Sequence, residues 1–169
     1  MRKSIVNLTL LLLLIFASSC GTTHVSRSSF IEEYSYECIG IVKNGDYIIR
    51  SNFTTSGKSI ENAINEAQKR VVNEVLFNGI AGDSENRVKD IKPLCDKFPD
   101  NDDTKRFFNE FFVNNGKYTL YVGTVHDDIP QVVRLPFGYR IDVNLIIKLN
   151  SLRKELENKG IVKSLTDTL

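Results

Sequence analysis

The sequence has little of what metal binding, nucleic-acid binding or catalysis would require. It contains two histidines, His24 and His126, and a zinc site needs several nitrogen or sulfur ligands. Basic and acidic residues number 22 and 21, so no basic patch predicts nucleic-acid binding. No Gly-x-Ser-x-Gly motif or other nucleophile motif is present. The sequence therefore predicts no catalytic residue, no metal and no cofactor, and we expect a protein that is not an enzyme.

No apolar run reaches the roughly 20 residues of a membrane-spanning helix. The run Leu8–Phe16 follows two basic residues and ends in Ala17-Ser18-Ser19, directly before Cys20. A basic start, a short apolar middle and small residues are typical of a secretory signal, and the cysteine stands where a lipoprotein is cleaved. We therefore predict a signal peptide over residues 1–19, with palmitate or other acyl chains on Cys20 as the membrane anchor. An ordinary cleaved signal and an uncleaved anchor remain alternatives.

The residues after Cys20 are small and polar and predict a flexible tether over residues 20–33. No acidic residue follows Cys20 before Glu32. By resemblance to lipoprotein sorting rules, the lack of an adjacent aspartate argues against retention in the inner membrane. The lack of an acidic cluster argues against display on the cell surface. We therefore expect the protein at the outer membrane, facing the periplasm.

Without the leader the chain has 150 residues, the size of one domain, and we predict this domain over residues 34–160, with a tail over 161–169. Asn44-Gly45 between two β-type runs predicts a hairpin. Apolar residues at steps of three and four from Ile60 predict a long amphipathic helix that ends at Gly79 or Gly82. The remaining expected elements are a helix over 104–113 capped by Asp102 or Asp103, strands over 117–125, 131–135 and 139–149, and a helix over 152–158 capped by Ser151. This order predicts an α+β fold, with a mainly antiparallel sheet and its helices packed on one face.

Two groups of side chains have alternative interpretations. If Cys20 is acylated, Cys38 and Cys95 could form a disulfide in an oxidising compartment, or they could be two buried thiols. The four phenylalanines of the second helix could form a partner surface if the sheet does not cover them, or they could pack in the core. These are Phe107, Phe108, Phe111 and Phe112.

Several stretches resemble known exported proteins. Ile39-Gly40-Ile41, the helix from Ala63 to Gly79, and the run from Gly116 to Val122 resemble the N-terminal domain of flagellar assembly protein T. The runs Phe77–Gly82 and Leu156–Lys163 are similar to small uncharacterised lipoproteins of Bacteroidota. The first resemblance implies a fold, and the second covers most of the mature chain without implying an activity.

These observations favour a non-enzymatic lipoprotein that binds an envelope protein or polymer as an accessory of a larger assembly. A carrier that holds a small molecule or lipid in an apolar cavity is the alternative. An envelope hydrolase with scattered catalytic groups is a third hypothesis.

Overall fold

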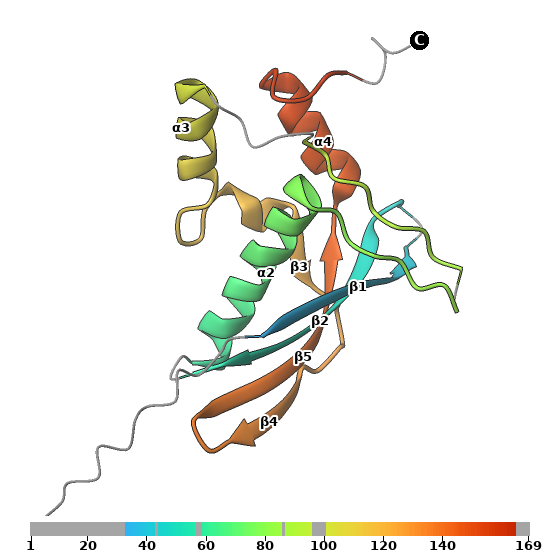
Figure 1. Cartoon of the computed structure of the whole chain (residues 1–169), viewed down its shortest axis with the longest axis vertical. Coiled ribbons are helices and arrows are strands. Elements are labelled where there is room, and N and C mark those ends of the chain that lie inside the picture. Colours follow the sequence, from blue (N-terminus) through green and yellow to red (C-terminus); the bar gives the residue numbers. More distant parts are fainter. Residues whose placement is uncertain (1–32, 43, 57–58, 86, 96–100, 165–169) are drawn as a thin grey trace, which may run out of the picture. The chain divides into compact units, whose positions relative to one another are not determined.

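The described chain confirms the α+β fold (Figure 1). The computed structural model describes residues 33–42, 44–56, 59–85, 87–95 and 101–164, so Cys20, the predicted signal peptide and nearly all of the predicted tether lie outside the described residues. The five strands form one antiparallel sheet, in which β2 pairs with one edge of β5 while β3 and β4 share the other edge. The strands are β1 (Tyr34–Ile41), β2 (Tyr47–Thr55), β3 (Val122–Thr124), β4 (Gln131–Leu135) and β5 (Gly138–Ile147).

The predicted hairpin is confirmed. Strands β1 and β2 pair in antiparallel register from Tyr34 opposite Phe53 to Ile41 opposite Tyr47. Gly45 lies in the turn with a φ of 78°, a left-handed conformation that glycine adopts at little cost. The register shifts between Cys38 and Gly40, which marks a β-bulge in β1.

The long helix is also confirmed, as α2 (Ile60–Phe77). The Ser59 hydroxyl caps its start by accepting a hydrogen bond from the Asn62 amide at 3.2 Å. Gly79, with a φ of 81°, ends the helix and donates its N–H to the Glu74 carbonyl. The apolar stripe faces the sheet, and burial of each large side chain contributes about 1.5–3 kcal/mol. The buried residues of this stripe are Ala63, Ala67, Val71, Val72, Val75 and Leu76.

The predicted strand over residues 117–125 is wrong for its first half. Lys117–Leu120 is a 3-10 helix, η1, and only Val122–Thr124 forms a strand. Tyr118 is 1% exposed, and the Tyr121 N–H donates to its carbonyl, as the three-residue repeat of a 3-10 helix requires. The buried side chains of this run are therefore spaced three to four residues apart, as in a helix, and do not alternate as in the strand that the sequence suggested.

The two shorter helices begin earlier than predicted. Helix α3 (Asp102–Phe111) is capped by Asn101, whose side-chain oxygen accepts from the Thr104 amide at 2.8 Å, so Asp102 and Asp103 lie in its first turn. Helix α4 (Leu149–Asn158) starts directly after β5, with Lys148 at the cap position, and Ser151 lies inside the helix. After α4, Ile161 and Val162 pack against the core, so the folded part extends beyond the predicted boundary at residue 160.

The two edges of the sheet differ. The bulge in β1 pairs with the segment after α2, since the Cys38 amide donates to the Ala81 carbonyl at 2.8 Å and the Asp83 amide donates to the Cys38 carbonyl at 3.0 Å. The outer edge of β4 has no such cover, because within the described residues β4 pairs only with β5. One edge is therefore partly closed and the other is open.

Candidate functional site

The two cysteines of the domain are buried, and within the described chain no disulfide joins Cys38 to Cys95. Both belong to the core cluster, at 0% and 5% exposure. Burial raises the pKa of the Cys38 thiol, and a hydrogen bond with the Gly40 backbone opposes part of this increase. The structure thus shows the alternative of two buried thiols.

Phe107, Phe108 and Phe111 of α3 pack with Phe112, which lies at the C-cap of the helix, and a role of these side chains as a partner surface stays a prediction. Phe108 and Phe111 are 4% and 0% exposed, and Phe107 and Phe112 are half-buried. Phe108 meets Phe77 of α2 edge to face with ring centroids 5.3 Å apart. The cluster attaches α3 to α2 because aromatic pairs add about 0.5–1.5 kcal/mol to their burial.

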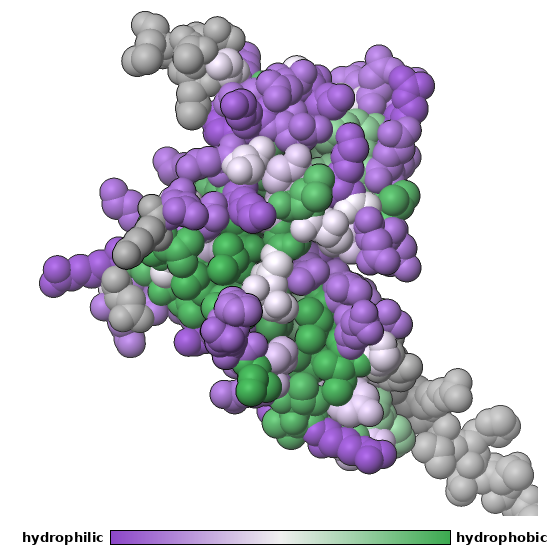
Figure 2. Space-filling view, turned by 180° about the vertical axis from the view of Figure 1, so that it is seen from behind, coloured by the Kyte–Doolittle hydropathy of each residue, from purple (hydrophilic) through white to green (hydrophobic). Residues whose placement is uncertain are grey.

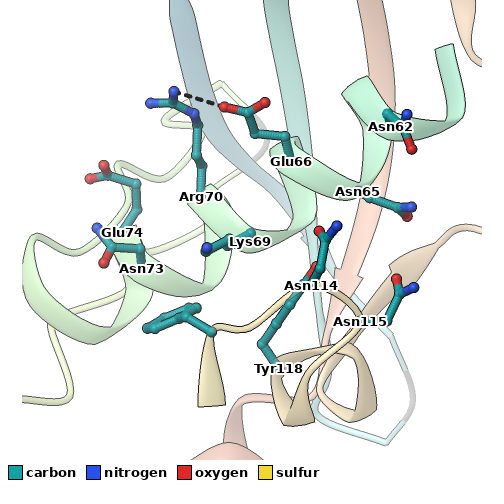
Figure 3. A pocket seen from close by; sticks show the side chains of 11 residues that line it. Asn62, Asn65, Glu66, Lys69, Arg70, Asn73, Glu74, Asn114, Asn115 and Tyr118 are labelled. Atoms are coloured by element: carbon teal, nitrogen blue, oxygen red, sulfur yellow. Dashed lines mark hydrogen bonds and ion pairs between the residues drawn. The ribbon is translucent and has the colours of Figure 1, made fainter. Parts of the chain in front are cut away.

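A polar groove lies between α2 and the chain that follows α3 (Figure 3). It is partly open to solvent and has a volume of about 690 Å³, within the usual range of small-molecule sites, about 300–1,000 Å³. Five asparagines give it an unusual lining, and we call it the amide groove. Its lining residues are Asn62, Asn65, Glu66, Lys69, Arg70, Asn73 and Glu74 of α2, and Phe112, Asn114, Asn115 and Tyr118.

The two walls of the amide groove come from distant parts of the sequence. The α2 side chains form one wall, and Asn114, Asn115 and Tyr118 form the other (Figure 3). The second wall is shaped by a tight turn in which the Gly116 amide donates to the Val113 carbonyl at 2.8 Å. A Cβ at Gly116 would lie 2.6 Å from the Phe111 carbonyl oxygen, so only glycine fits there. Asn115 has a φ of 56°, a conformation that asparagine tolerates better than most residues.

Two of the four charges in the amide groove form an ion pair with each other. Arg70 donates to Glu66 at 3.1 Å and its guanidinium stacks 4.0 Å from the centre of the Tyr34 ring. Burial alone would lower the pKa of Arg70, but the hydrogen bond to Glu66 and the nearby phenols outweigh this effect. The net shift of the pKa is upward, so the guanidinium stays charged. Glu74 accepts from the Asn78 amide at 2.8 Å. Lys69 has no ion-pair partner among the described residues, and its Nζ lies 5.9 Å from the centre of the Phe112 ring.

Two tyrosines at or near the groove are wholly or partly buried, Tyr118 in its lining and Tyr36 on β1. Burial raises the pKa of Tyr118, and a backbone hydrogen bond with Asn115 opposes part of this effect. Burial also raises the pKa of Tyr36 far above its usual range, and the Tyr36 hydroxyl has no hydrogen-bond partner among the described residues. Both phenols stay protonated at neutral pH, so neither supplies a base.

A second surface is apolar and lies along β4. Strand β4 is exposed over its first four residues, and apolar side chains both within it and on either side of it face solvent. Figure 2 shows apolar residues gathered in the lower part of the molecule, where Figure 1 places β4 and β5. We call this surface the β4 edge, and its exposed apolar residues are Ile129 (84%), Val132 (38%), Val133 (54%) and Phe137 (74%).

The described histidine does not form a site. The His126 side chain is 96% exposed, and its closest charged neighbour is Asp127, at 3.5 Å. Among the described residues no group of three potential metal ligands comes together. No helix in the described part of the chain is both long and apolar enough to cross a membrane.

Comparison of the chain with family models, with curated proteins and with solved structures finds no match. The resemblances to small Bacteroidota lipoproteins and to flagellar assembly protein T therefore stay predictions.

The sequence does not predict the amide groove as a whole. One signal could have indicated part of it, because the three asparagines of the long helix fall at residues 62, 65 and 73, on one side of the helix. The strand at 131–135 was predicted, but nothing in its sequence indicated that its outer edge would be open.

Proposed function

We propose that the protein is a lipoprotein of the outer membrane, anchored through acyl chains on Cys20, that faces the periplasm, binds an envelope protein and catalyses no reaction. The observation that carries this proposal is the β4 edge. An unpaired strand edge offers a row of backbone N–H and C=O groups that a partner segment can join as an additional strand.

The β4 edge has some of the features that normally protect such strands, because it is short, carries one charge and lies between two prolines, but it keeps exposed apolar side chains. Within Gln131–Leu135 the one charged residue is Arg134, and the prolines at 130 and 136 lie outside the strand. Proteins usually place lysine, proline or a bulge on an exposed edge to prevent pairing with other chains. At about 3.4 Å a residue, β4 offers about 17 Å of edge, enough for a partner segment of about five residues.

The exposed side chains would give such a partner its specificity. Ile129 and Phe137 flank the strand, and Val132 and Val133 point to opposite faces of the sheet, as neighbouring residues of a strand do. A partner strand with apolar residues would bury these side chains on both faces. Main-chain hydrogen bonds would supply affinity, and the apolar contacts would select the sequence.

A site-specific crosslinking experiment in intact envelopes tests this proposal. A photoreactive benzoylphenylalanine replaces Val133 in one variant and Ile41 in the matched control, because the two side chains are 54% and 55% exposed. We expect one adduct with a different envelope protein at position 133 and none at position 41. The adduct should disappear when the β4 edge carries Val132→Lys. Equal adducts at both positions, no adduct at 133, or an adduct of twice the mass of this chain would contradict the proposal.

The carrier alternative has no specific support. A lipid carrier needs an apolar cavity, whereas the amide groove is lined by amide and charged side chains. Between α2 and the sheet, Val71, Phe53 and Ile141 are at most 1% exposed and belong to one packed cluster.

A further inference from the structure

We infer that the amide groove binds an oligosaccharide that carries acetamido groups. This inference goes beyond the protein-binding proposal and does not depend on it. The groove is built from α2 and residues 112–118, whereas the β4 edge is built from residues 129–137.

The first argument is the placement of asparagine on α2. This helix contains Asn62, Asn65 and Asn73, and all three line the groove. Asparagine is a poorer helix former than alanine, leucine, lysine or glutamate because its amide competes for backbone hydrogen bonds. Positions that oppose the local structure are expected at functional sites. The helix therefore carries its unfavourable residues where they face the groove.

The second argument is the hydrogen-bonding capacity that the groove leaves unused. Each asparagine side chain offers two N–H donors and two acceptor lone pairs. Among the described residues, none of the five groove amides hydrogen-bonds through its side chain to another protein group. An acetamido group presents one N–H and one C=O, and sugar hydroxyls both donate and accept. Amide side chains match both kinds of group without a charge.

The third argument is the charge balance of the groove. Glu66 and Arg70 pair with each other. The other two charges are the Glu74 carboxylate, which accepts a hydrogen bond from the neutral side-chain amide of Asn78, and the Lys69 ammonium, so the lining has no net charge. A groove with this balance does not favour a polyanion such as nucleic acid, which needs several cationic contacts. An uncharged ligand fits this balance better.

The shape of the groove also favours a sugar over a peptide. The backbone of α2 is hydrogen-bonded within the helix, so this wall offers no strand edge for a peptide to join. Apolar anchor side chains need pockets, but the aromatic lining consists of Phe112, which is half-buried, and Tyr118, which is 1% exposed. The exposed edge of Phe112 can contact the C–H groups of a sugar ring.

Binding of defined oligosaccharides to the purified full-length protein tests this inference. Chitotetraose carries an acetamido group on every ring, cellotetraose has hydroxyls in their place, and a blocked tetra-alanine peptide represents the peptide alternative. Binding is measured by saturation-transfer difference NMR and by thermophoresis. We expect chitotetraose to bind, and to bind at least several-fold more tightly than cellotetraose or the peptide.

Three substitutions locate the binding. Asn65→Ala and Asn114→Ala remove one amide from each wall, and each should weaken chitotetraose binding by about 2- to 10-fold, the effect of losing one or two hydrogen bonds. Asn109→Ala is the matched control, because Asn109 is an exposed asparagine of α3 outside the groove. Alanine favours the helix at both position 65 and position 109, so loss of binding in Asn65→Ala alone cannot come from unfolding.

Four outcomes would overturn the inference. They are no binding of chitotetraose, equal binding of cellotetraose, tighter binding of the peptide, and equal affinities in Asn65→Ala, Asn114→Ala and Asn109→Ala. Loss of crosslinking at the β4 edge with sugar binding retained would reject the protein-binding proposal alone.

Discussion

Replacement of Gly138 by alanine should destabilise the domain, because β2 and the start of β5 approach each other closely there. A Cβ at this position would lie 2.0 Å from the Thr55 carbonyl oxygen and 2.9 Å from the Thr55 carbonyl carbon. Both are backbone atoms, so the two strands would have to separate by about 1 Å. Overpacking of this kind costs about 1–3 kcal/mol. Alanine also lowers the entropy of the unfolded chain, which offsets about 0.4–1 kcal/mol of this cost. We therefore expect the free energy of unfolding to fall by about 1–2 kcal/mol.

Gly123→Ala is the matched control in the same sheet, since a Cβ there would have no heavy atom within 4 Å. It should leave the free energy of unfolding unchanged or raise it by about 0.4–1 kcal/mol. Urea unfolding measures both variants. With a slope of about 1–3 kcal/mol per molar urea, the midpoint of Gly138→Ala should fall by about 0.3–2 M. Equal midpoints for the two variants would refute the close approach of β2 and β5 at Thr55.

Two further predictions concern the core. Phe111 is 0% exposed, so Phe111→Ala should lower the free energy of unfolding by about 3–5 kcal/mol. Phe137 is 74% exposed, so Phe137→Ala should change it by less than about 0.5 kcal/mol. Thermal unfolding of both variants measures the difference, and similar losses would contradict the core position of Phe111. Because burial raises the pKa of Cys38, iodoacetamide at pH 8 should modify this thiol far more slowly in the native protein than in urea. Peptide mass spectrometry measures the rate, and equal native and denatured rates would contradict its burial.

The sequence predicted those elements whose local signals agree with the packing of the whole domain. Asn44-Gly45 supplies a turn that matches the twist of β1 and β2, and the stripe from Ile60 gives α2 the one face that the sheet can bury. In these cases propensity, periodicity and turn chemistry all favour the same structure.

The predictions fail where contacts between residues distant in the sequence determine the local structure. In the run Lys117–Val122 apolar residues alternate well enough for a strand, but burial of Tyr118 beside Phe112, which follows α3, requires a 3-10 turn instead. The start of α4 was missed because it follows β5 without a side-chain cap. The amide groove is lined by residues 62–74 together with residues 112–118, and no local sequence pattern predicts that these two segments lie side by side.

Gly82 and Cys38 form a parallel bridge that covers part of the outer edge of β1. A sheet whose two outer strands are both unpaired can be extended from both sides, so identical molecules can stack without limit into fibres. Here the segment after α2 covers β1 at Cys38, whereas β4 pairs only with β5 among the described residues. The cover at Cys38 therefore works against endless stacking, and shortening the segment after α2 should make the protein more prone to form fibres.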